Sequence, residues 1–369
     1  MTSTPSLEIS QIGVSIWLDD LSKDRLTSGS LAALMEHNHV VGVTSNPTIF
    51  AGAVSGSDSY TGDLADLARA GVTPEEAVFE VMIRDIQGAC DLMRPVFDST
   101  DGLDGRVSLE VSPLLAHDTS GTIEQAKDLW NRVDRPNLMI KIPATKAGLP
   151  AISEAIGEGI SVNVTLIFSL ERYGEVIDAY FDGIEKAQAA GHSLSAIRSV
   201  ASFFVSRVDA AIDAKLDAVN TPEATALRSL SAVANARLAY ELFLERHNSG
   251  RAQGLKQKGM NNQRPLWAST GVKDPSLPPA YYVTELAVAD VVNTMPEKTL
   301  MALEAVGVVE GDRVTGYFDA ARETLGAVED LGISLAQVTD ALEQDGVEKF
   351  VQSWRELLET VANAMEGSA

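Results

Sequence analysis

The sequence predicts an α/β fold, a single TIM (β/α)8 barrel with extra helices that extends over residues 1–369. Short β-rich runs alternate with longer helical stretches, about eight such runs occur, and no internal repeat or long linker divides the chain. Eight strands that alternate with helices are the number that closes a barrel. The alternative is a doubly wound open sheet, but the sequence lacks the glycine-rich phosphate turn of that fold.

The expected strands are short runs rich in β-branched and aromatic residues. Several are apolar on both faces, which is typical of parallel strands that helices cover. In chain order they are expected at 13–18, 40–43, 106–111, 137–142, 160–168, 199–205, 265–269 and 291–296.

The clearest helix start between these runs is at Thr73. Thr73 can be the N-cap, Pro74 the first helical residue, and Glu76 closes a capping box. A glycine- and serine-rich segment at 51–62 is instead expected to be mobile. Further helices are expected at 24–36, 122–132, 170–190 and within 210–247.

The chain from Gly332 onward is expected to be helical, with Ser334 opening a possible capping box. Its apolar residues recur at steps of three and four, which predicts a C-terminal helix packed on the barrel. A partner helix would use the same stripe, but core packing is the more common outcome. The stripe consists of Val347, Phe350, Val351, Trp354, Leu357, Leu358 and Val361.

The composition excludes several classes of function. A net charge of −23 disfavours binding to nucleic acid or to a membrane surface, because both need basic patches. The single cysteine, Cys90, excludes a disulfide framework and suits a reducing cytoplasm. The sequence shows no signal peptide and no apolar run long enough for a membrane helix. Metal-ligand spacing and the HExxH, Walker and GxGxxG motifs are absent, so we expect no metal and no nucleotide.

Lys141 breaks the apolar pattern of the fourth strand, where an ammonium ion is expensive to bury. Burial lowers the pKa of a lysine, and a neutral amine is a nucleophile that can form a Schiff base with a carbonyl group. Two structural alternatives remain open at this point. The lysine could be an edge-strand charge that discourages aggregation, or its amine could reach solvent.

Further polar residues lie within or at the carboxyl ends of the predicted strands, where a TIM barrel has its active site. Asp19 and Asp20 could simply cap the next helix, and 44–47 could be an ordinary turn. Arg207 could form a surface ion pair, but its place after the sixth strand favours a phosphate contact. The polar set is Asp19, Thr44, Asn46, Glu110, Lys141, Asn163, Thr165 and Ser202.

Five segments together resemble the transaldolases, in the order that this family has them. The segment at 267–273, the length and the acidic character resemble the longer, actinobacterial- and cyanobacterial-like form. The five segments are SIWLDD at 15–20, TSNPTIF at 44–50, NLMIKIPAT at 137–145, NVTLIFS at 163–169 and SFFVSR at 202–207.

The resemblance implies catalytic roles for four residues. Lys141 would be the Schiff-base nucleophile, and Asp19 the general base that takes the proton from the substrate C4 hydroxyl. Glu110 and Thr165 would handle a catalytic water.

It also implies a set of substrate contacts. Asn46 and Asn163, with Thr44, would hold the dihydroxyacetone unit, while Ser202 and Arg207 would bind phosphate. Lys273 is the nearest candidate for a second phosphate-binding cation, and Ser206 stands where some members have glycine.

The activity implied is a step of the pentose phosphate pathway. It transfers a dihydroxyacetone unit from sedoheptulose 7-phosphate to glyceraldehyde 3-phosphate and needs no cofactor. One alternative is a class I aldolase that releases dihydroxyacetone, and another is a catalytically silent barrel that acts as a binding protein. The protein is expected to be a monomer or a homodimer.

Overall fold

A computed structural model describes residues 4–366 of the chain. Eight parallel strands follow one another around a closed barrel, and β1 pairs with both β2 and β8. The predicted α/β barrel is therefore confirmed. The strands are β1 Val14–Asp19, β2 Val40–Thr44, β3 Arg106–Glu110, β4 Leu138–Pro143, β5 Val162–Ile167, β6 Ser199–Phe204, β7 Gln263–Ala268 and β8 Val291–Met295.

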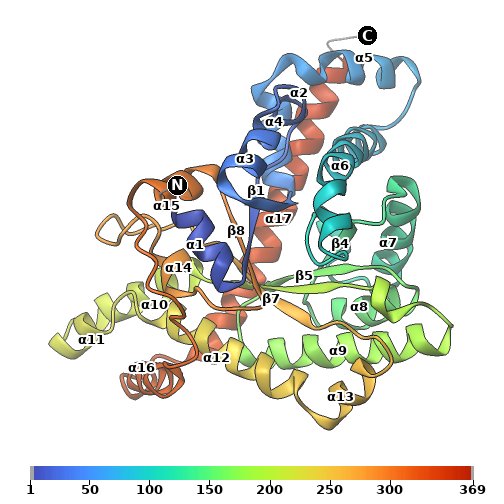
Figure 1. Ribbon diagram of the computed structural model, residues 1–369. Coiled ribbons are helices and arrows are strands. Elements are labelled where there is room, and N and C mark those ends of the chain that lie inside the picture. Colours follow the sequence, from blue (N-terminus) through green and yellow to red (C-terminus); the bar gives the residue numbers. More distant parts are fainter. Residues whose placement is uncertain (1–3, 367–369) are drawn as a thin grey trace.

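Helices surround the barrel, and most begin at a side-chain cap (Figure 1). The predicted capping box at Thr73 is present and opens α6. The helices before β5 are α1 Pro5–Ile12, α2 Lys23–Thr27, α3 Ser30–Asn38, α4 Pro47–Gly56, α5 Thr61–Arg69, α6 Pro74–Ser99, α7 Thr119–Val133 and α8 Gly148–Gly157. Those after β5 are α9 Leu170–Ala189, α10 Ser206–Val219, α11 Pro222–Ala226, α12 Ser231–His247, α13 Gly250–Lys256, α14 Tyr281–Glu285, α15 Glu297–Val306, α16 Phe318–Asp330 and α17 Leu335–Glu366. Short 3-10 turns are η1 Asp58–Tyr60, η2 Pro113–Leu115 and η3 Leu194–Ala196.

The register of the strands places predicted site residues at one level. Lys141 of β4 is the register partner of Glu110 on β3 and of Asn163 on β5. Asp19 of β1 is likewise the partner of Thr44 on β2. Because side chains alternate between the two faces of a strand, a slip of one residue would turn any of these groups away from the barrel interior.

Trp17 of β1 is fully buried and packs over the backbone of β2. A Cβ atom added at Gly42 would lie 2.5 Å from Trp17 Nε1, so only glycine leaves room for the indole ring.

The C-terminal helix α17 crosses the carboxyl end of the barrel. It contacts β5 and α10 and continues past α4, α5 and α6, along the path of the red helix in Figure 1. Ser334 caps it, since its hydroxyl accepts a hydrogen bond from Gln337 N at 3.3 Å. Trp354 and Phe350 of its apolar stripe are buried against the body of the protein. The predicted packing of this helix on the barrel is confirmed.

The segment at 51–62 contains the end of α4, the turn η1 and the start of α5, with Val54 and Tyr60 buried; its mobility stays a prediction. One element prediction is wrong. The helix expected at 24–36 is instead two helices, α2 and α3, separated at Gly29, whose φ of 79° interrupts the helical backbone. Neither α1 nor α8 was expected.

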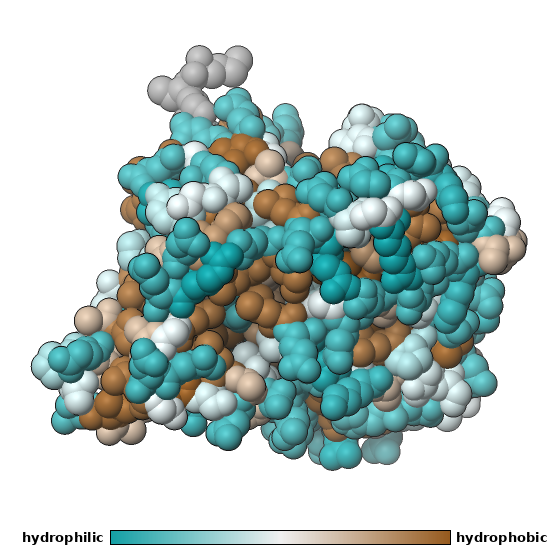
Figure 2. All heavy atoms as spheres, turned by 90° about the horizontal axis from the view of Figure 1, so that it is seen from below, coloured by the Kyte–Doolittle hydropathy of each residue, from teal (hydrophilic) through white to brown (hydrophobic). Residues whose placement is uncertain are grey.

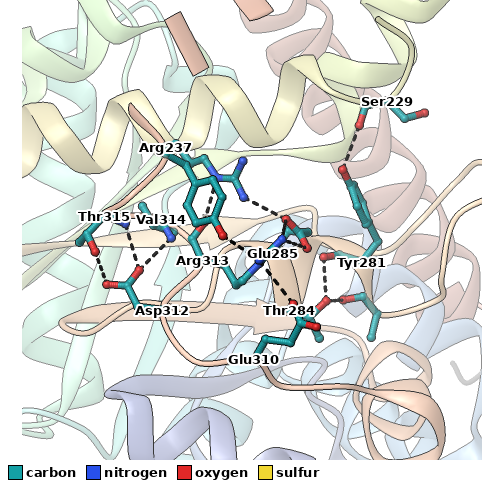
Figure 3. A network of polar contacts seen from close by, with 12 residues as sticks. Ser229, Arg237, Tyr281, Thr284, Glu285, Glu310, Asp312, Arg313, Val314 and Thr315 are labelled. Carbon is teal, nitrogen blue, oxygen red and sulfur yellow. Dashed lines mark hydrogen bonds and ion pairs between the residues drawn. The ribbon is translucent and has the colours of Figure 1, made fainter. Parts of the chain in front are cut away.

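The link between α15 and α16 is held by a polar network around Glu285 (Figure 3). Arg237 of α12 donates to Glu285 Oε2 at 2.9 Å and to the Arg313 carbonyl at 2.9 Å. Arg313 donates to Glu285 Oε1 at 3.2 Å and to the Tyr317 hydroxyl at 2.7 Å. Both guanidinium groups also lie over the Tyr317 ring. The network fixes a segment that has no regular secondary structure of its own.

Figure 2 shows the molecule from below, with hydrophilic and apolar residues intermixed on this face. Apolar residues surround a hollow left of the centre of the view. Within residues 4–366, no helix combines the length and the apolar character that crossing a bilayer requires.

Candidate active site

A cavity of about 210 Å³ opens at the carboxyl end of the barrel strands. Eight of the ten predicted site residues line it, and the other two, Glu110 and Asn163, are buried directly behind the lining. The lining consists of Asp19, Thr44, Asn46, Lys141, Thr165, Ser202, Phe204, Arg207, Ala268, Ser269, Gly271, Lys273, Thr294, Pro296 and Phe350.

Lys141 is buried in the barrel interior, with only 6% of its surface exposed. Its Nζ donates to the Ser45 carbonyl at 2.8 Å and lies 3.8 Å from Glu110 Oε2. The closed barrel has no edge at β4, and the amine does not extend into bulk solvent. Both structural alternatives for this lysine are therefore excluded.

Asp19 lines the same cavity as Lys141. Its carboxylate lines the cavity, but protein surrounds it, and this burial raises its pKa above the usual range. Attraction by Lys141 and a hydrogen bond from Thr44 Oγ1, at 2.7 Å from Asp19 Oδ1, oppose the rise. Thr44 Oγ1 in turn lies 2.8 Å from Thr294 Oγ1 of β8.

Asp20 does not cap the following helix, since Ser22 is the N-cap of α2. Its carboxylate pairs with Arg25, which also pairs with Glu297 at 2.8 Å. Of the two neighbouring acids, the one that faces the cavity is Asp19.

Glu110 is buried and lies between Lys141 and Thr165. Burial raises its pKa, repulsion by Asp19 adds to the rise, and Lys141 and the Thr165 hydroxyl oppose it. Its Oε2 and Thr165 Oγ1 both lack a partner of good hydrogen-bond geometry among the described residues. The pair thus presents two unused polar atoms next to the amine.

Thr165 lies at an irregularity of the sheet. The β5–β6 register shifts between Val164 and Ile167, and Leu166 has a φ of 59°, in the left-handed region that leucine seldom adopts. Bulges of this kind redirect side chains next to active sites. Here the irregular segment carries Thr165 into the cavity wall.

Asn46 has two functions in one side chain. Its Oδ1 accepts a hydrogen bond from Ile49 N at 3.0 Å and so caps α4, while the residue also lines the cavity. The carbonyl oxygen of the amide is therefore used by the fold, and its NH2 group remains for a ligand. The segment at 44–47 is a strand-to-helix connection rather than an ordinary turn.

Asn163 is fully buried, and both ends of its amide are engaged. Its Oδ1 accepts from Ser202 Oγ at 2.7 Å, and its Nδ2 donates to Ser108 Oγ at 3.1 Å. In this arrangement Asn163 supports Ser202, which does line the cavity. Ser108 belongs to this chain of hydrogen bonds and was not predicted.

Arg207 lies in the first turn of α10, with its guanidinium group 5.2 Å from the centre of the Phe204 ring. Its buried Nη1 has no partner among the described residues. Burial lowers the pKa of Arg207, and attraction by the carboxylates of Asp345 and Asp19 opposes this shift. A half-buried cation with an unpartnered nitrogen, at a helix N-terminus, suits an anionic ligand.

Ser206 and Lys273 complete the predicted set. The hydroxyl of Ser206 lies 2.9 Å from the hydroxyl of Ser269, which lines the cavity. The serine that stands where some family members have glycine is therefore held by a hydrogen bond. Lys273 is exposed at the rim.

Sequence reasoning missed Thr294, Ser269 and Phe350. Thr294 belongs to a predicted strand end and could have been found by the rule that identified Thr44. Phe350 comes from α17, far along the chain, and its spacing is that of a core residue, so no local signal distinguishes it.

A closed parallel barrel with a buried lysine, a buried glutamic acid and an aspartic acid in the cavity wall at its carboxyl end defines an enzyme of the α/β-barrel class. The chain belongs to the Transaldolase/Fructose-6-phosphate aldolase family, whose model matches residues 16–361. It is 57% identical over 362 residues to the transaldolase of Thermobifida fusca (strain YX), covering 98% of each chain. It is 56% identical over 362 residues to that of Acidothermus cellulolyticus (98% and 97% covered) and 52% identical over 367 residues to that of a Parafrankia strain (100% of each).

Proposed function

We propose that the protein is a transaldolase that moves a dihydroxyacetone unit from sedoheptulose 7-phosphate to glyceraldehyde 3-phosphate, giving erythrose 4-phosphate and fructose 6-phosphate. The observation that carries the proposal is the buried amine of Lys141, which shares one cavity with Asp19 and lies 3.8 Å from Glu110 Oε2. Family membership over residues 16–361 gives independent support.

In the first step Lys141 Nζ attacks the ketone carbon C2 of the donor, and the carbinolamine so formed loses water to give a protonated imine. The amine must be unprotonated when it attacks, and Glu110, 3.8 Å away, is the nearest group that can accept its proton. Loss of water requires proton delivery to the departing hydroxyl. The unpartnered oxygens of Glu110 and Thr165 offer contacts for a water that carries that proton.

In the second step the bond between C3 and C4 breaks. Its electron pair moves into the imine to form an enamine, while Asp19 takes the proton of the C4 hydroxyl, which becomes the aldehyde carbonyl. An aspartate with a raised pKa is a stronger base once it is ionised, so burial of Asp19 favours this transfer. Transfer to the acceptor aldehyde runs the same steps in reverse.

The enamine must persist until the acceptor arrives. The free NH2 group of Asn46 is positioned to hold a substrate hydroxyl, with Thr44 beside it. Asn163 acts through Ser202 in this proposal, since its own amide is engaged.

The phosphate group of either sugar is proposed to bind Arg207. Lys273 at the rim would add a second positive charge, and Ser202 would contact the phosphate after its hydroxyl turns away from Asn163.

The reaction needs no cofactor, because the imine itself accepts the electron pair. We infer that the chain acts as one domain, as a monomer or a homodimer, in the cytoplasm.

Borohydride trapping with fructose 6-phosphate tests the proposal. Reduction is expected to fix the three-carbon unit on Lys141, to leave Lys141→Ala unlabelled, and to label Lys273→Ala on Lys141 as in the wild type. Label on another lysine, or none, would contradict the assignment. Product analysis with and without glyceraldehyde 3-phosphate separates transfer from aldolase activity, because an aldolase releases free dihydroxyacetone in both cases.

A further inference from the structure

Three arginines gather at the amino-terminal end of the barrel, around one small cavity that Trp17 also lines. Arg106 belongs to β3, Arg264 to β7, and Arg198 directly precedes β6. Arg106 is 2% exposed and Arg264 is 7% exposed. The three side chains and Trp17 line a second, much smaller cavity of about 10 Å³, also bordered by Met139 and Asn262.

The positive charge of this cluster exceeds its negative charge. Arg264 pairs with Asp104, with Nη2 3.0 Å from Oδ1. Among the described residues, this is the one ion pair that any of the three arginines forms. Arg106 donates to the carbonyls of Gly102 and Pro136, and Arg198 donates to the carbonyl of Asp101. Neutral carbonyls satisfy hydrogen bonds but do not cancel charge.

The arginines also repel one another. Burial lowers the pKa of Arg106 to about 9, and Arg198 and Arg264 contribute to the shift. Burial, and after it repulsion by Arg264, lowers the pKa of Arg198, and the carboxylates of Asp101 and Asp104 only partly oppose this shift. In a chain with a net charge of −23, such a cation-rich interior is a local exception.

Two hydrogen-bond donors of this cavity have no partner. Arg198 Nε and Trp17 Nε1 are buried, and neither donates to any described group. Buried donors are nearly always satisfied, so unsatisfied ones beside excess positive charge indicate an acceptor with negative charge. The Asn262 amide, whose Oδ1 is also unpartnered, can present its NH2 group after a half-turn. A volume of about 10 Å³ admits an acceptor of about the size of one water molecule.

We propose that this cavity binds a single halide-sized anion, chloride under ordinary conditions, held by Arg106, Arg198 and Arg264. The anion accepts hydrogen bonds from Arg198 Nε and Trp17 Nε1 and offsets the repulsion among the guanidinium groups. A water molecule would accept the same hydrogen bonds but would leave the charge uncompensated. Because the cavity exists only in the folded barrel, anion binding stabilises the native state.

A crystal of the wild-type protein soaked in sodium bromide tests the site directly. An anomalous bromine peak is expected between the three guanidinium groups, and a map with no peak there, or with water only, would overturn the proposal. This measurement needs no variant and no substrate, so its outcome is independent of the proposed transaldolase activity.

Thermal unfolding tests the consequence in solution. Replacing sodium gluconate by sodium chloride at equal concentration is expected to raise the melting temperature by roughly 2 to 5 °C, because gluconate is too large for the cavity. Equal sodium keeps the screening of the acidic surface unchanged. The chloride-dependent rise is expected to disappear in Arg198→Met and to persist in Arg69→Met, whose arginine is exposed. An equal rise in both variants would contradict the site.

Discussion

The side chains around Lys141 have pKa values and hydrogen bonds that local sequence does not determine. Asp19 and Asp20 are neighbours, yet one lines the cavity and the other pairs with Arg25. The difference follows from their positions, because Asp19 is the last residue of β1 and Asp20 lies after the strand has ended. The two acids therefore form a matched pair for mutation.

Asp19→Asn is expected to lower kcat on the order of 10² to 10⁴-fold, the usual contribution of a general base. Lys141 still forms the imine in this variant, so borohydride trapping should continue while carbon–carbon cleavage fails. The control Asp20→Asn should retain most of its turnover. Steady-state kinetics combined with trapping measures both effects, and loss of trapping in Asp19→Asn would show that the residue acts earlier than proposed.

Arg207→Ala is expected to raise KM for phosphorylated sugars by roughly 10- to 100-fold, the effect of one charge-assisted hydrogen bond. KM for an unphosphorylated dihydroxyacetone donor should change far less. Lys273→Ala should have a smaller effect of the same kind, because that lysine is exposed. Equal losses on both classes of donor would mean that Arg207 does not contact phosphate.

At the scale of elements, α17 links the end of the chain to the irregular segment of β5. A Cβ atom at Gly346 would lie 2.9 Å from Leu166 Cδ2, and Leu166 follows Thr165 with a φ of 59°. Phe350, one turn further along the helix, lines the cavity. The helix therefore packs against Leu166, whose backbone conformation helps to set the position of Thr165.

Gly346→Val is expected to displace Leu166 and lower kcat on the order of 10- to 100-fold, with a loss of about 1–3 kcal/mol in unfolding free energy. The matched control is Gly326→Val in α16, where a Cβ atom meets nothing within 4 Å. The imine-forming step, followed by rapid-quench trapping, should slow more than carbon–carbon cleavage. An unchanged kcat in the destabilised Gly346→Val protein would assign α17 a purely structural role.

The elements that the sequence predicted best are those with strong periodicity or explicit caps. All eight strands and the helices begun by Thr73 and Ser334 follow from alternation, apolar runs and capping residues. The helical turns within 51–62 were not predicted, because glycine and serine have low helix propensity, and burial of Val54 and Tyr60 outweighs that propensity. The position of Phe350 depends on how α17 crosses the barrel, which no local pattern encodes.

At the scale of the whole molecule, stability should depend on pH through buried acids outside the cavity. Asp85 of α6 is 5% exposed and accepts a hydrogen bond from the Tyr60 hydroxyl at 2.7 Å. Burial raises its pKa from 3.8 to about 6. Between these values the native state binds a proton that the unfolded chain does not, so the stabilisation is present below pH 3.8 and is lost as pH rises through about 6.

Asp85→Asn is therefore expected to raise the unfolding free energy at about pH 7 by roughly 1–3 kcal/mol, because the amide keeps the acceptor for Tyr60 without the buried charge. The gain should vanish at about pH 3.5. Denaturant unfolding at both pH values measures it, with the exposed Asp66→Asn as control. A loss of stability at neutral pH would mean that the ionised carboxylate is favourable in the fold.

Closure of the barrel has a consequence for protein synthesis. The pocket needs Thr294 beside Thr44, and β1 finds its second neighbour only when β8 is present. A nascent polypeptide that already carries Lys141 is therefore expected to lack a finished pocket until β8 and Phe350 of α17 have also been made. Fragments that end before β8 are expected to show no transfer activity.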